Sequence, residues 1–364
     1  MRHLFFYSTL CFLVLCAGGC SKSNSSSSKP PTPKQAVVTT IAGDGSNGFA
    51  DGMGTAAKFY HPYGIVIDGP GNLYVSDEGN YRIRKITSAG SVTTLAGSGA
   101  GHADGSGASA SFYGPEGLTW DAVGNIIVAE LINNRIRRVT TSGVVTTVAG
   151  NTEGYVDGTG TAAEFYYPTN VTADMTGNLF VADSYNQRIR KITSAGVVTT
   201  FVGGGTTGPG NGSFLDGTGT AARFQSPAGM VFDASGNMYM VDGGNNRIRK
   251  VTPAGVVTTY AGSGATGHQD GNAQTAEFAA PTGLAIDGAG DLFVADFGNN
   301  CIREITPDGN VTTIAGSSSS YSGSADGMGT AASFDGPSSL VFDASGNLYI
   351  ADNSNNLIRK ITFK

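Results

Sequence analysis

The sequence predicts an all-β fold in which one structural unit is repeated six times around a closed ring. Three observations support this prediction. The stretch 62–97 recurs in cognate copies, a second phrase precedes each copy, and the end of the last copy is found at the other end of the chain. The copies begin at Pro62, Pro115, Pro168, Pro227, Pro281 and Pro337. Their spacing of about 53 to 59 residues is in the range of solenoids and propellers.

Each copy divides into four short segments of strand-forming residues. In the first copy these segments are 64–68 (GIVID), 73–77 (LYVSD), 82–87 (RIRKIT) and 91–97 (SVTTLAG). Short apolar or β-branched runs separated by Gly, Asn and Asp turns are typical of strands. Four antiparallel strands per repeat, joined in sequence order, form a β-propeller blade. Residues 37–364 are therefore predicted to form a six-bladed β-propeller of four-stranded blades.

The last copy lacks its fourth strand, and residues 37–43 (VVTTIAG) have the sequence of the missing piece. We expect this N-terminal strand to complete the last blade and so close the ring. Pairing the first and last strands leaves no free sheet edge between the first and last blades.

The phrase before each copy reads D-G-x-G-T-A-A-x-F-x-x-P in its clearest form. In the first copy, we expect a turn at Asp51-Gly52, a single helical turn capped by Thr55, and a buried ring at Phe59. This linker joins the fourth strand of one blade to the first strand of the next. It is expected to share a face with the turn between strands two and three, where loops of variable chemistry gather.

The consensus P-x-G-[IVLM]-x-x-D-x-x-G-N-[LI]-[YF]-V-A-D-x-x-N-x-R-I-R-[KR]-[IV] resembles the NHL repeat, and the resemblance covers residues 37–364. It implies a six-bladed propeller. The departures from the pattern are local, at Glu130, Asn170, Cys301, Leu357 and Ser338-Ser339. RNA binding is known for some members of this family. The net charge of −6 argues against nucleic acid here, because phosphate backbones need a basic face.

The N-terminal residues predict export. Arg2 and His3 precede an apolar run at 4–15, which is too short to span a bilayer, and residues 1–19 have the layout of a signal peptide. Small residues just before Cys20 resemble a bacterial lipoprotein signal, although Ala17 stands where that family usually has Leu. We expect lipidation at Cys20, a flexible tether over 20–36, and anchoring to the cell envelope at the outer membrane. The alternative is ordinary signal cleavage and a soluble secreted product.

Most of the carboxylates form three rings that repeat from blade to blade. The turn ring is Asp68, Asp121, Asp174, Asp233, Asp287 and Asp343, and the linker ring is Asp51, Asp104, Asp157, Asp216, Asp270 and Asp326. The strand-end ring is Asp77, Glu130, Asp183, Asp242, Asp296 and Asp352. We expect the strand-end ring to pair with Arg84, Arg137, Arg190, Arg249, Arg303 and Arg359, and the other two rings to form Asx turns.

A residue that recurs in every blade serves the blade rather than a reaction, so none of these rings is predicted to be catalytic. The alternative, Ca²⁺ in the D-G-x-G loops, has oxygen ligands in its favour but few carboxylates per turn. Propeller lyases rely on His, and lactonase-like propellers use a Glu, Asn and Asp cluster around calcium. No unique cluster of either kind stands out, although Glu116 and Asn170 could face the central channel. No cofactor and no metal site are predicted.

Residues that break the symmetry are more informative. Tyrosines and polar residues follow the linker Phe in the first three blades, where later blades have Gln225, Ala279 and Asp335. The candidate ligand-binding residues are Tyr60, His61, Tyr63, Tyr113, Glu116, Tyr166, Tyr167 and Tyr185. Tyr suits recognition surfaces because it combines apolar area with a polar tip. The alternative is that these rings only pack the loops.

The sequence therefore predicts a non-catalytic binding module of the bacterial cell envelope, a monomer whose loop face takes a glycan or a protein partner. The competing prediction is a calcium-dependent hydrolase or lyase, similar to the lactonase-like propellers, acting in the central channel. A third is a scaffold without a small ligand.

Overall fold

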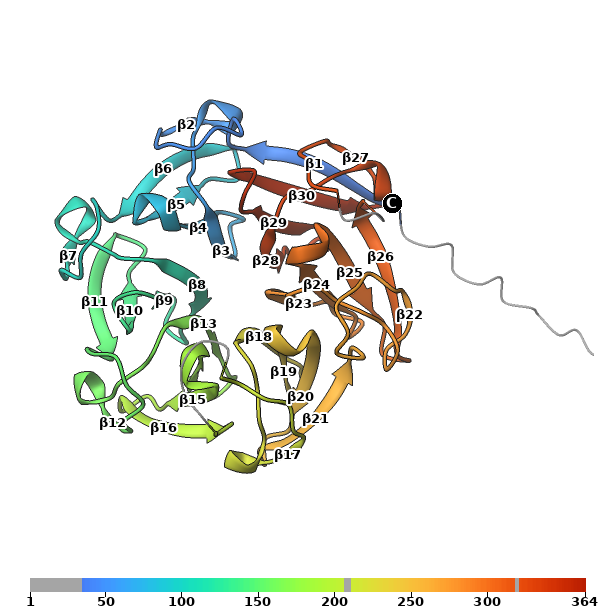
Figure 1. Cartoon of the computed structure of the whole chain (residues 1–364). Helices are drawn as coiled ribbons and strands as arrows, with labels where there is room; N and C mark the ends of the chain where they lie inside the picture. The colour runs from blue at the N-terminus through green and yellow to red at the C-terminus, as the bar shows by residue number, and fades with distance from the viewer. Residues whose placement is uncertain (1–34, 206–210, 318–320) are drawn as a thin grey trace, which may run out of the picture. The chain divides into compact units, whose positions relative to one another are not determined.

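The computed structural model describes residues 35–205, 211–317 and 321–364. The predicted signal peptide at 1–19, Cys20 and nearly all of the predicted tether lie outside the described residues. The compact unit that begins at Lys34 is all-β. Six antiparallel sheets are arranged around a central axis, as in a six-bladed β-propeller (Figure 1), which confirms the predicted fold. None of the described residues belongs to a helix long and apolar enough to cross a membrane.

The first blade shows the common plan. Its strands are β2 (Gly52–Met53), β3 (Pro62–Ile67), β4 (Leu73–Asp77), β5 (Arg82–Ile86) and β6 (Ser91–Ala96). They pair in the order β2-β6-β5-β4-β3, with β3 next to the axis and β2 at the rim (Figure 1).

The other blades follow the same order. The second blade has β7 (Gly105–Ser106), β8 (Pro115–Trp120), β9 (Ile126–Glu130), β10 (Arg135–Val139) and β11 (Val144–Ala149). The third has β12 (Gly158–Thr159), β13 (Pro168–Ala173), β14 (Leu179–Asp183), β15 (Arg188–Ile192) and β16 (Val197–Val202). The fourth has β17 (Gly217–Thr218), β18 (Pro227–Phe232), β19 (Met238–Asp242), β20 (Arg247–Val251) and β21 (Val256–Ala261). The fifth has β22 (Gly271–Asn272), β23 (Gly283–Ile286), β24 (Leu292–Asp296), β25 (Cys301–Ile305) and β26 (Asn310–Gly316).

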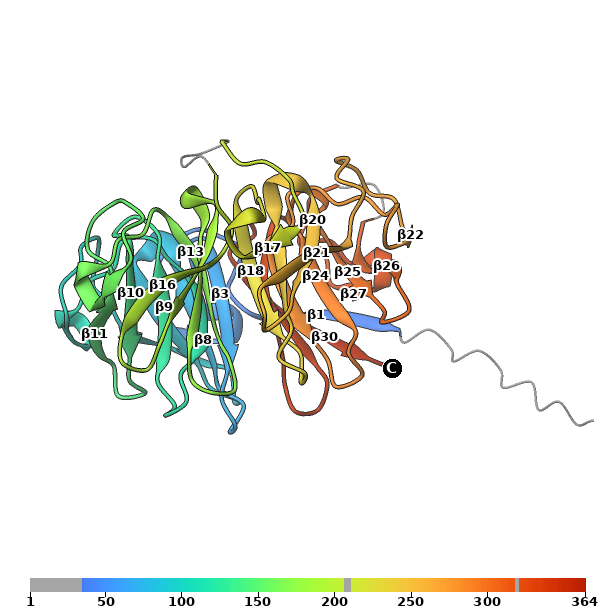
Figure 2. The same cartoon turned by 90° about the horizontal axis from the view of Figure 1, so that it is seen from below.

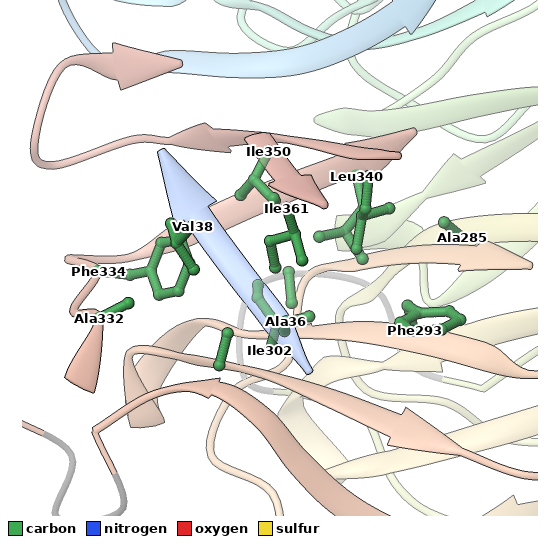
Figure 3. Close-up of a cluster of buried hydrophobic side chains, with 13 residues drawn as sticks. Ala36, Val38, Ala285, Phe293, Ile302, Ala332, Phe334, Leu340, Ile350 and Ile361 are labelled. Carbon is green, nitrogen blue, oxygen red and sulfur yellow. The ribbon is translucent and has the colours of Figure 1, made fainter. Parts of the chain in front are cut away.

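The sixth blade is closed by the N-terminal strand. Strand β1 (Ala36–Ala42) lies between β30 (Leu357–Phe363) and β27 (Gly327–Met328), and β29 (Leu348–Asp352) and β28 (Pro337–Phe342) complete the sheet. Val38 is opposite Ile361 on one side and Gly327 on the other. Figure 3 shows Val38 against Phe334, within a buried cluster that also contains Ile361. The predicted closure is therefore present.

Each blade has five strands rather than the predicted four. The extra strand is the two-residue rim strand formed by the linker, as where Gly52 pairs with Val92 of β6. The predicted cap by Thr55 is wrong. The linker forms a short 3₁₀ turn, η1 (Gly54–Ala56), entered through Met53 without a side-chain cap. Gly54 has φ +51° and its N–H donates to the carbonyl of Gly90, so the backbone of the neighbouring turn holds the start of η1. The corresponding turns are η3 (Gly107–Ser109), η4 (Gly160–Ala162), η6 (Gly219–Ala221) and η9 (Gly329–Ala331).

The linkers and the turns after the second blade strand lie on one face, which we name the linker face (Figure 2). In the first blade that turn is η2 (Glu78–Asn80), whose Gly79 N–H donates to the carbonyl of Tyr60 at 2.8 Å. The side chain of Asn80 donates to the carbonyl of Gly48 at 2.7 Å. The equivalent 3₁₀ turns are η5 (Ser184–Asn186), η7 (Gly243–Asn245) and η8 (Phe297–Asn299).

A buried arginine joins these parts in every blade. In the first blade, Arg84 Nη1 lies 2.7 Å from Asp77 Oδ2, and both side chains are fully buried. Arg84 Nη2 lies 2.8 Å from Asp51 Oδ1 and donates to the carbonyl of Ala50. Asp77 also accepts from the backbone N–H of Tyr60. The strand-end carboxylates and the arginines make the same pair in the other five blades, at 2.6–2.9 Å.

The linker ring does not form the predicted Asx turns. Asp51 contacts Arg84 and the hydroxyl of Thr94 on the outer strand, partners that are 33 and 43 residues away in the chain. The equivalent carboxylates pair with their own arginines in the other five blades. The turn ring forms the predicted Asx turns in five blades, as where Asp121 Oδ1 accepts from the backbone N–H of Val123 at 3.0 Å. In the first blade the residue two positions on is Pro70, which has no N–H, and Asp68 Oδ1 accepts from the N–H of Asn72 at 2.7 Å.

Deleting residues 37–43 should abolish cooperative unfolding, because it removes the strand that joins the last blade to the first and closes the ring. The measurement is a thermal melt followed by circular dichroism and calorimetry. Val38→Ala should lower the melting temperature, since Val38 is buried, whereas Thr39→Ala on the exposed side of the same strand should not. A deletion variant that melts like the parent would contradict the closure.

Asp77→Ala should destabilise the protein far more than Asp51→Ala. The first change leaves a buried guanidinium without its buried partner and should cost about 3–5 kcal/mol. The second removes a carboxylate whose side chain is 48% exposed, and it should cost about 1 kcal/mol or less. Urea unfolding of the two variants measures the difference. Equal losses would show that burial does not set the strength of these pairs.

Candidate functional site

Three of the predicted ligand-binding tyrosines form one group, which we name the tyrosine cluster: Tyr166, Tyr167 and Tyr185. The ring centroids lie 5.1 Å apart for Tyr166 and Tyr167, 5.1 Å for Tyr166 and Tyr185, and 4.6 Å for Tyr167 and Tyr185. All three rings are partly exposed on the linker face.

The backbone of the tyrosine cluster is held from three sides. The N–H of Tyr166 donates to Asp183 of the buried arginine pair at 2.7 Å, and the N–H of Tyr185 donates to the carbonyl of Tyr166 at 3.1 Å. Tyr167, at φ +51°, donates its N–H to Asn134 of the second blade at 2.9 Å. The cluster is therefore a fixed surface and not a set of free side chains.

The other predicted tyrosines do not join this cluster. Tyr60 stacks on its neighbour His61, with centroids 4.6 Å apart. Tyr113 makes an edge contact with Tyr81 at 5.5 Å, a partner that the sequence analysis missed. The predicted aromatic half-face is thus divided into separate patches. Tyr60 and Tyr113 are the most exposed of the predicted tyrosines, at 37% and 38%.

Tyr63 and Glu116 lie deeper, at the mouth of the central channel. Each is the second residue of an innermost strand, β3 or β8, directly after the blade-opening proline. The equivalent residues in the other blades are small: Thr169, Ala228, Thr282 and Ser338. Glu116 is only 6% exposed, and its Oε2 is buried without a hydrogen-bond partner among the described residues.

The backbone at Glu116 is fixed by the hydroxyl of Ser76, which has no counterpart in the other blades. Ser76 Oγ donates to the carbonyl of Glu116 at 2.6 Å and accepts from the N–H of Gly64 at 2.7 Å. The other blades have Ala129, Ala182, Val241, Ala295 and Ala351 in the place of Ser76. A Cβ on Gly64 would lie 2.3 Å from the carbonyl oxygen of Glu116, so only glycine allows β3 and β8 to approach this closely.

Two further residues, Glu78 and His61, belong to the group at the mouth of the central channel. Burial raises the pKa of Glu116 well above its usual range, and the negative charge of Glu78 raises it further. Burial also raises the pKa of Glu78, against the opposing charge of His61. The pKa of Tyr63 is raised well above its usual value by burial and then by Glu116 and Glu78. We name these four residues the mouth cluster: His61, Tyr63, Glu78 and Glu116.

Glu78 was missed by the sequence analysis. It follows the strand-end Asp77, and the only signal for it was that the equivalent residues are Leu131, Ser184, Gly243, Phe297 and Asn353, none of which is acidic. His61 is held in place by Asn353 of the sixth blade, whose Oδ1 lies 3.1 Å from His61 Nδ1. The mouth cluster thus draws on the first two blades and is supported by the last.

The channel below contains a cavity of about 140 Å³, lined by the innermost strands and including Asn170, which was predicted to face it. A second cavity of about 230 Å³ lies between the third and fourth blades, against Phe180 and Phe232, and none of the predicted site residues lines it. Within the described residues, no three His, Cys, Asp or Glu side chains group closely enough to hold a metal ion.

Glu116→Gln should stabilise the protein at neutral and alkaline pH. The folded-state pKa of Glu116 is raised, so its favourable contribution is complete below the unfolded pKa of about 4.3 and declines as pH rises toward the folded pKa. Glutamine does not ionise, so the Glu116→Gln variant does not lose this stability as the pH rises. Melting temperatures from pH 5 to pH 8 should therefore fall more steeply for the parent than for Glu116→Gln, with Glu277→Gln as the control. Parallel curves would contradict a buried ionisable Glu116.

The sequence model of the NHL repeat matches residues 278–305 and 334–361. The chain is 30% identical over 287 residues to Protein SUPPRESSOR OF QUENCHING 1, chloroplastic, of Arabidopsis thaliana, covering 74% of this chain and 27% of that protein. It is 29% identical over 306 residues to NHL repeat-containing protein 2 of Bos taurus, covering 74% and 42% respectively. The chain therefore spans well under half the length of these relatives.

Solved structures share the fold at low identity. An auxiliary nutrient binding protein from Bacteroides thetaiotaomicron has a TM-score of 0.70 at 20% identity, covering 91% of this chain and 77% of that one. A gluconolactonase from Xanthomonas campestris has a TM-score of 0.60 at 13% identity, with 90% of each chain covered. Together with the repeat match and the six sheets, these findings identify the chain as a six-bladed β-propeller that contains NHL repeats.

Proposed function

We propose that this propeller is a non-catalytic binding module of the bacterial cell envelope, and that its linker face takes a glycan or a protein partner. The observation that carries the proposal is the tyrosine cluster. Three partly exposed rings in mutual contact, on a backbone fixed by Asp183 and Asn134, form a rigid aromatic surface with polar hydroxyls.

A glycan fits this surface better than an extended apolar peptide. A sugar ring has an apolar C–H face that can stack on an aromatic ring, and hydroxyls around its edge that can bond phenol oxygens. Rings that are fixed before binding lose little conformational entropy when the ligand arrives. In the fourth blade the same positions hold Gln225, Ser226 and Gly244, which offer no such stacking surface.

The comparisons support binding in general terms. One structure with the same fold is described as an auxiliary nutrient binding protein of a Bacteroides species. Others are described as a gluconolactonase and as a virginiamycin B lyase, so the fold alone does not decide between binding and catalysis. The choice made here rests on the tyrosine cluster.

The cellular location is part of the proposal. An exported chain with a lipid on Cys20 would hold the propeller near the envelope surface, within reach of cell-wall or nutrient glycans. The expected arrangement is a monomer that contacts the membrane through the lipid alone.

Thermal melting against a panel of cell-wall and dietary glycans, with and without Ca²⁺, tests the proposal. A ligand at about 100 times its dissociation constant should stabilise the protein by roughly 2.7 kcal/mol, a shift of a few degrees. Tyr166→Ala should abolish the shift. Tyr321→Ala, which removes a 75% exposed tyrosine of the sixth blade, should leave it intact.

Two outcomes would overturn the glycan form of the proposal. A shift that survives Tyr166→Ala would place the site elsewhere. A panel without any effect would leave a protein partner as the occupant, which pull-down from membranes with the parent and Tyr166→Ala chains would test. A shift that requires Ca²⁺ would favour the calcium-dependent alternative.

A further inference from the structure

Several departures from the repeat converge on one place. Tyr63, Ser76, Glu78 and Glu116 each differ from the small or apolar residue found in most blades, and they come from four separate segments of the first two blades. The structure brings them together at the mouth of the central channel. A structural role shared by all blades does not explain a group confined to one junction.

Glu116 is the centre of this group. It is more than nine-tenths buried, and one of its carboxyl oxygens has no partner among the described residues. A buried acceptor without a donor is unfavourable, and more so when the group carries charge. Ser76 and Gly64 nevertheless hold the backbone of Glu116 in this position.

The charge that acts on Glu116 from its surroundings is negative. The segments that carry the mouth cluster are joined by hydrogen bonds, since Ser76 Oγ donates to the carbonyl of Glu116 and the N–H of Glu78 donates to the carbonyl of His61, next to Tyr63. The negative charge of Glu78 acts on Glu116. The buried arginines of the two blades, Arg84 and Arg137, are each already paired with two other carboxylates. His61 acts on Glu78 but is not among the groups that act on Glu116.

We propose that the mouth cluster is a binding site for a protonated amine, with Glu116 and Glu78 as its acceptors and the phenol of Tyr63 beside it. An ammonium group supplies both things that the site lacks, a hydrogen-bond donor for the free oxygen of Glu116 and a positive charge between two carboxylates. The site is separate from the tyrosine cluster and does not depend on glycan binding there.

Other ligand classes fit less well. An anion would meet two carboxylates. A neutral hydroxyl would fill the acceptor but leave the repulsion between Glu78 and Glu116. A divalent cation prefers six or more oxygen ligands, and the described residues contain no group of three or more His, Cys, Asp or Glu side chains placed to hold one.

Titration of the purified full chain with n-butylamine, followed by calorimetry, tests the proposal, with n-butanol as the uncharged probe of the same size. Butylamine should bind saturably and butanol should not. Glu116→Gln and Glu78→Gln should each weaken butylamine binding at least tenfold. Glu277→Gln, a carboxylate in the fifth-blade linker, should bind butylamine like the parent.

Proton release gives a second readout that a purely structural role would not produce. The amine should draw Glu116 into its ionised form, so binding measured in buffers of different ionisation enthalpy should release protons in the parent and fewer in Glu116→Gln. His61, Tyr63 and Glu78 are the titratable groups that face the site. Because Glu116→Gln is expected to be at least as stable as the parent, its melt distinguishes lost binding from lost folding.

Equal binding of butanol, unchanged affinity in Glu116→Gln, or binding of Ca²⁺ in place of butylamine would each overturn the proposal. Tyr166→Ala should bind butylamine normally, so failure of the glycan proposal and failure of this one are distinguishable. Comparing 1,4-diaminobutane with an acetylated lysine amide then shows whether the amine comes from a free polyamine or from a protein side chain, and tighter binding of either supports the site.

Discussion

Six buried guanidinium groups, each between two carboxylates, are the interaction on which the rest of the propeller depends. Arg84 alone ties together the end of the second strand through Asp77 and the linker through Asp51 and Ala50. Asp51 extends the connection to Thr94 on the outer strand, and Asp77 extends it to the backbone of Tyr60. A charge that is removed from water must be paired completely, so the linker has little freedom to take another path. The linker face, with the residues proposed to bind ligand, is therefore positioned by these pairs.

The same pairs explain how a surface of irregular loops can be rigid. The residue after each linker Phe has its N–H bound to a strand-end carboxylate, as Tyr166 does to Asp183. Side chains at that position can then vary from Tyr166 to Gln225 or Ala279 without any change in the backbone. The repeat supplies a constant frame, and the variable residues supply the chemistry.

Much of the fold could be predicted from the sequence because six copies repeat the same local signals. The closing strand was visible because one piece of the repeat was displaced to the other end. The linker carboxylates were assigned wrongly, since an Asx turn is a local pattern whereas the partners of Asp51 are Arg84 and Thr94. Glu78 was missed for a related reason. Its charge acts on Glu116 of the next blade, and no periodicity reports an interaction that occurs at a single junction.

At the mouth cluster, the protein departs from its most stable arrangement. Glutamine at Glu116, or a small residue as in the later blades, would avoid the burial of an ionisable group. The chain instead has Ser76, a residue type found at this position only in the first blade, to hold the backbone of Glu116. Residues that keep an unfavourable group in place are a physical reason to regard the mouth of the channel as functional.

Strand β1 is made first and finds its partner last. Its neighbours β27 and β30 are separated from it by almost the whole propeller, so the ring cannot close until β30 has left the ribosome. At about 5–20 residues per second, that interval is roughly 15 to 60 seconds. During this time the edges of β1 and of the unfinished sixth blade have no partner, and an unpaired edge invites pairing with other chains. The feature that gives the mature protein a closed ring thus makes the nascent chain depend on protection while it is being synthesised.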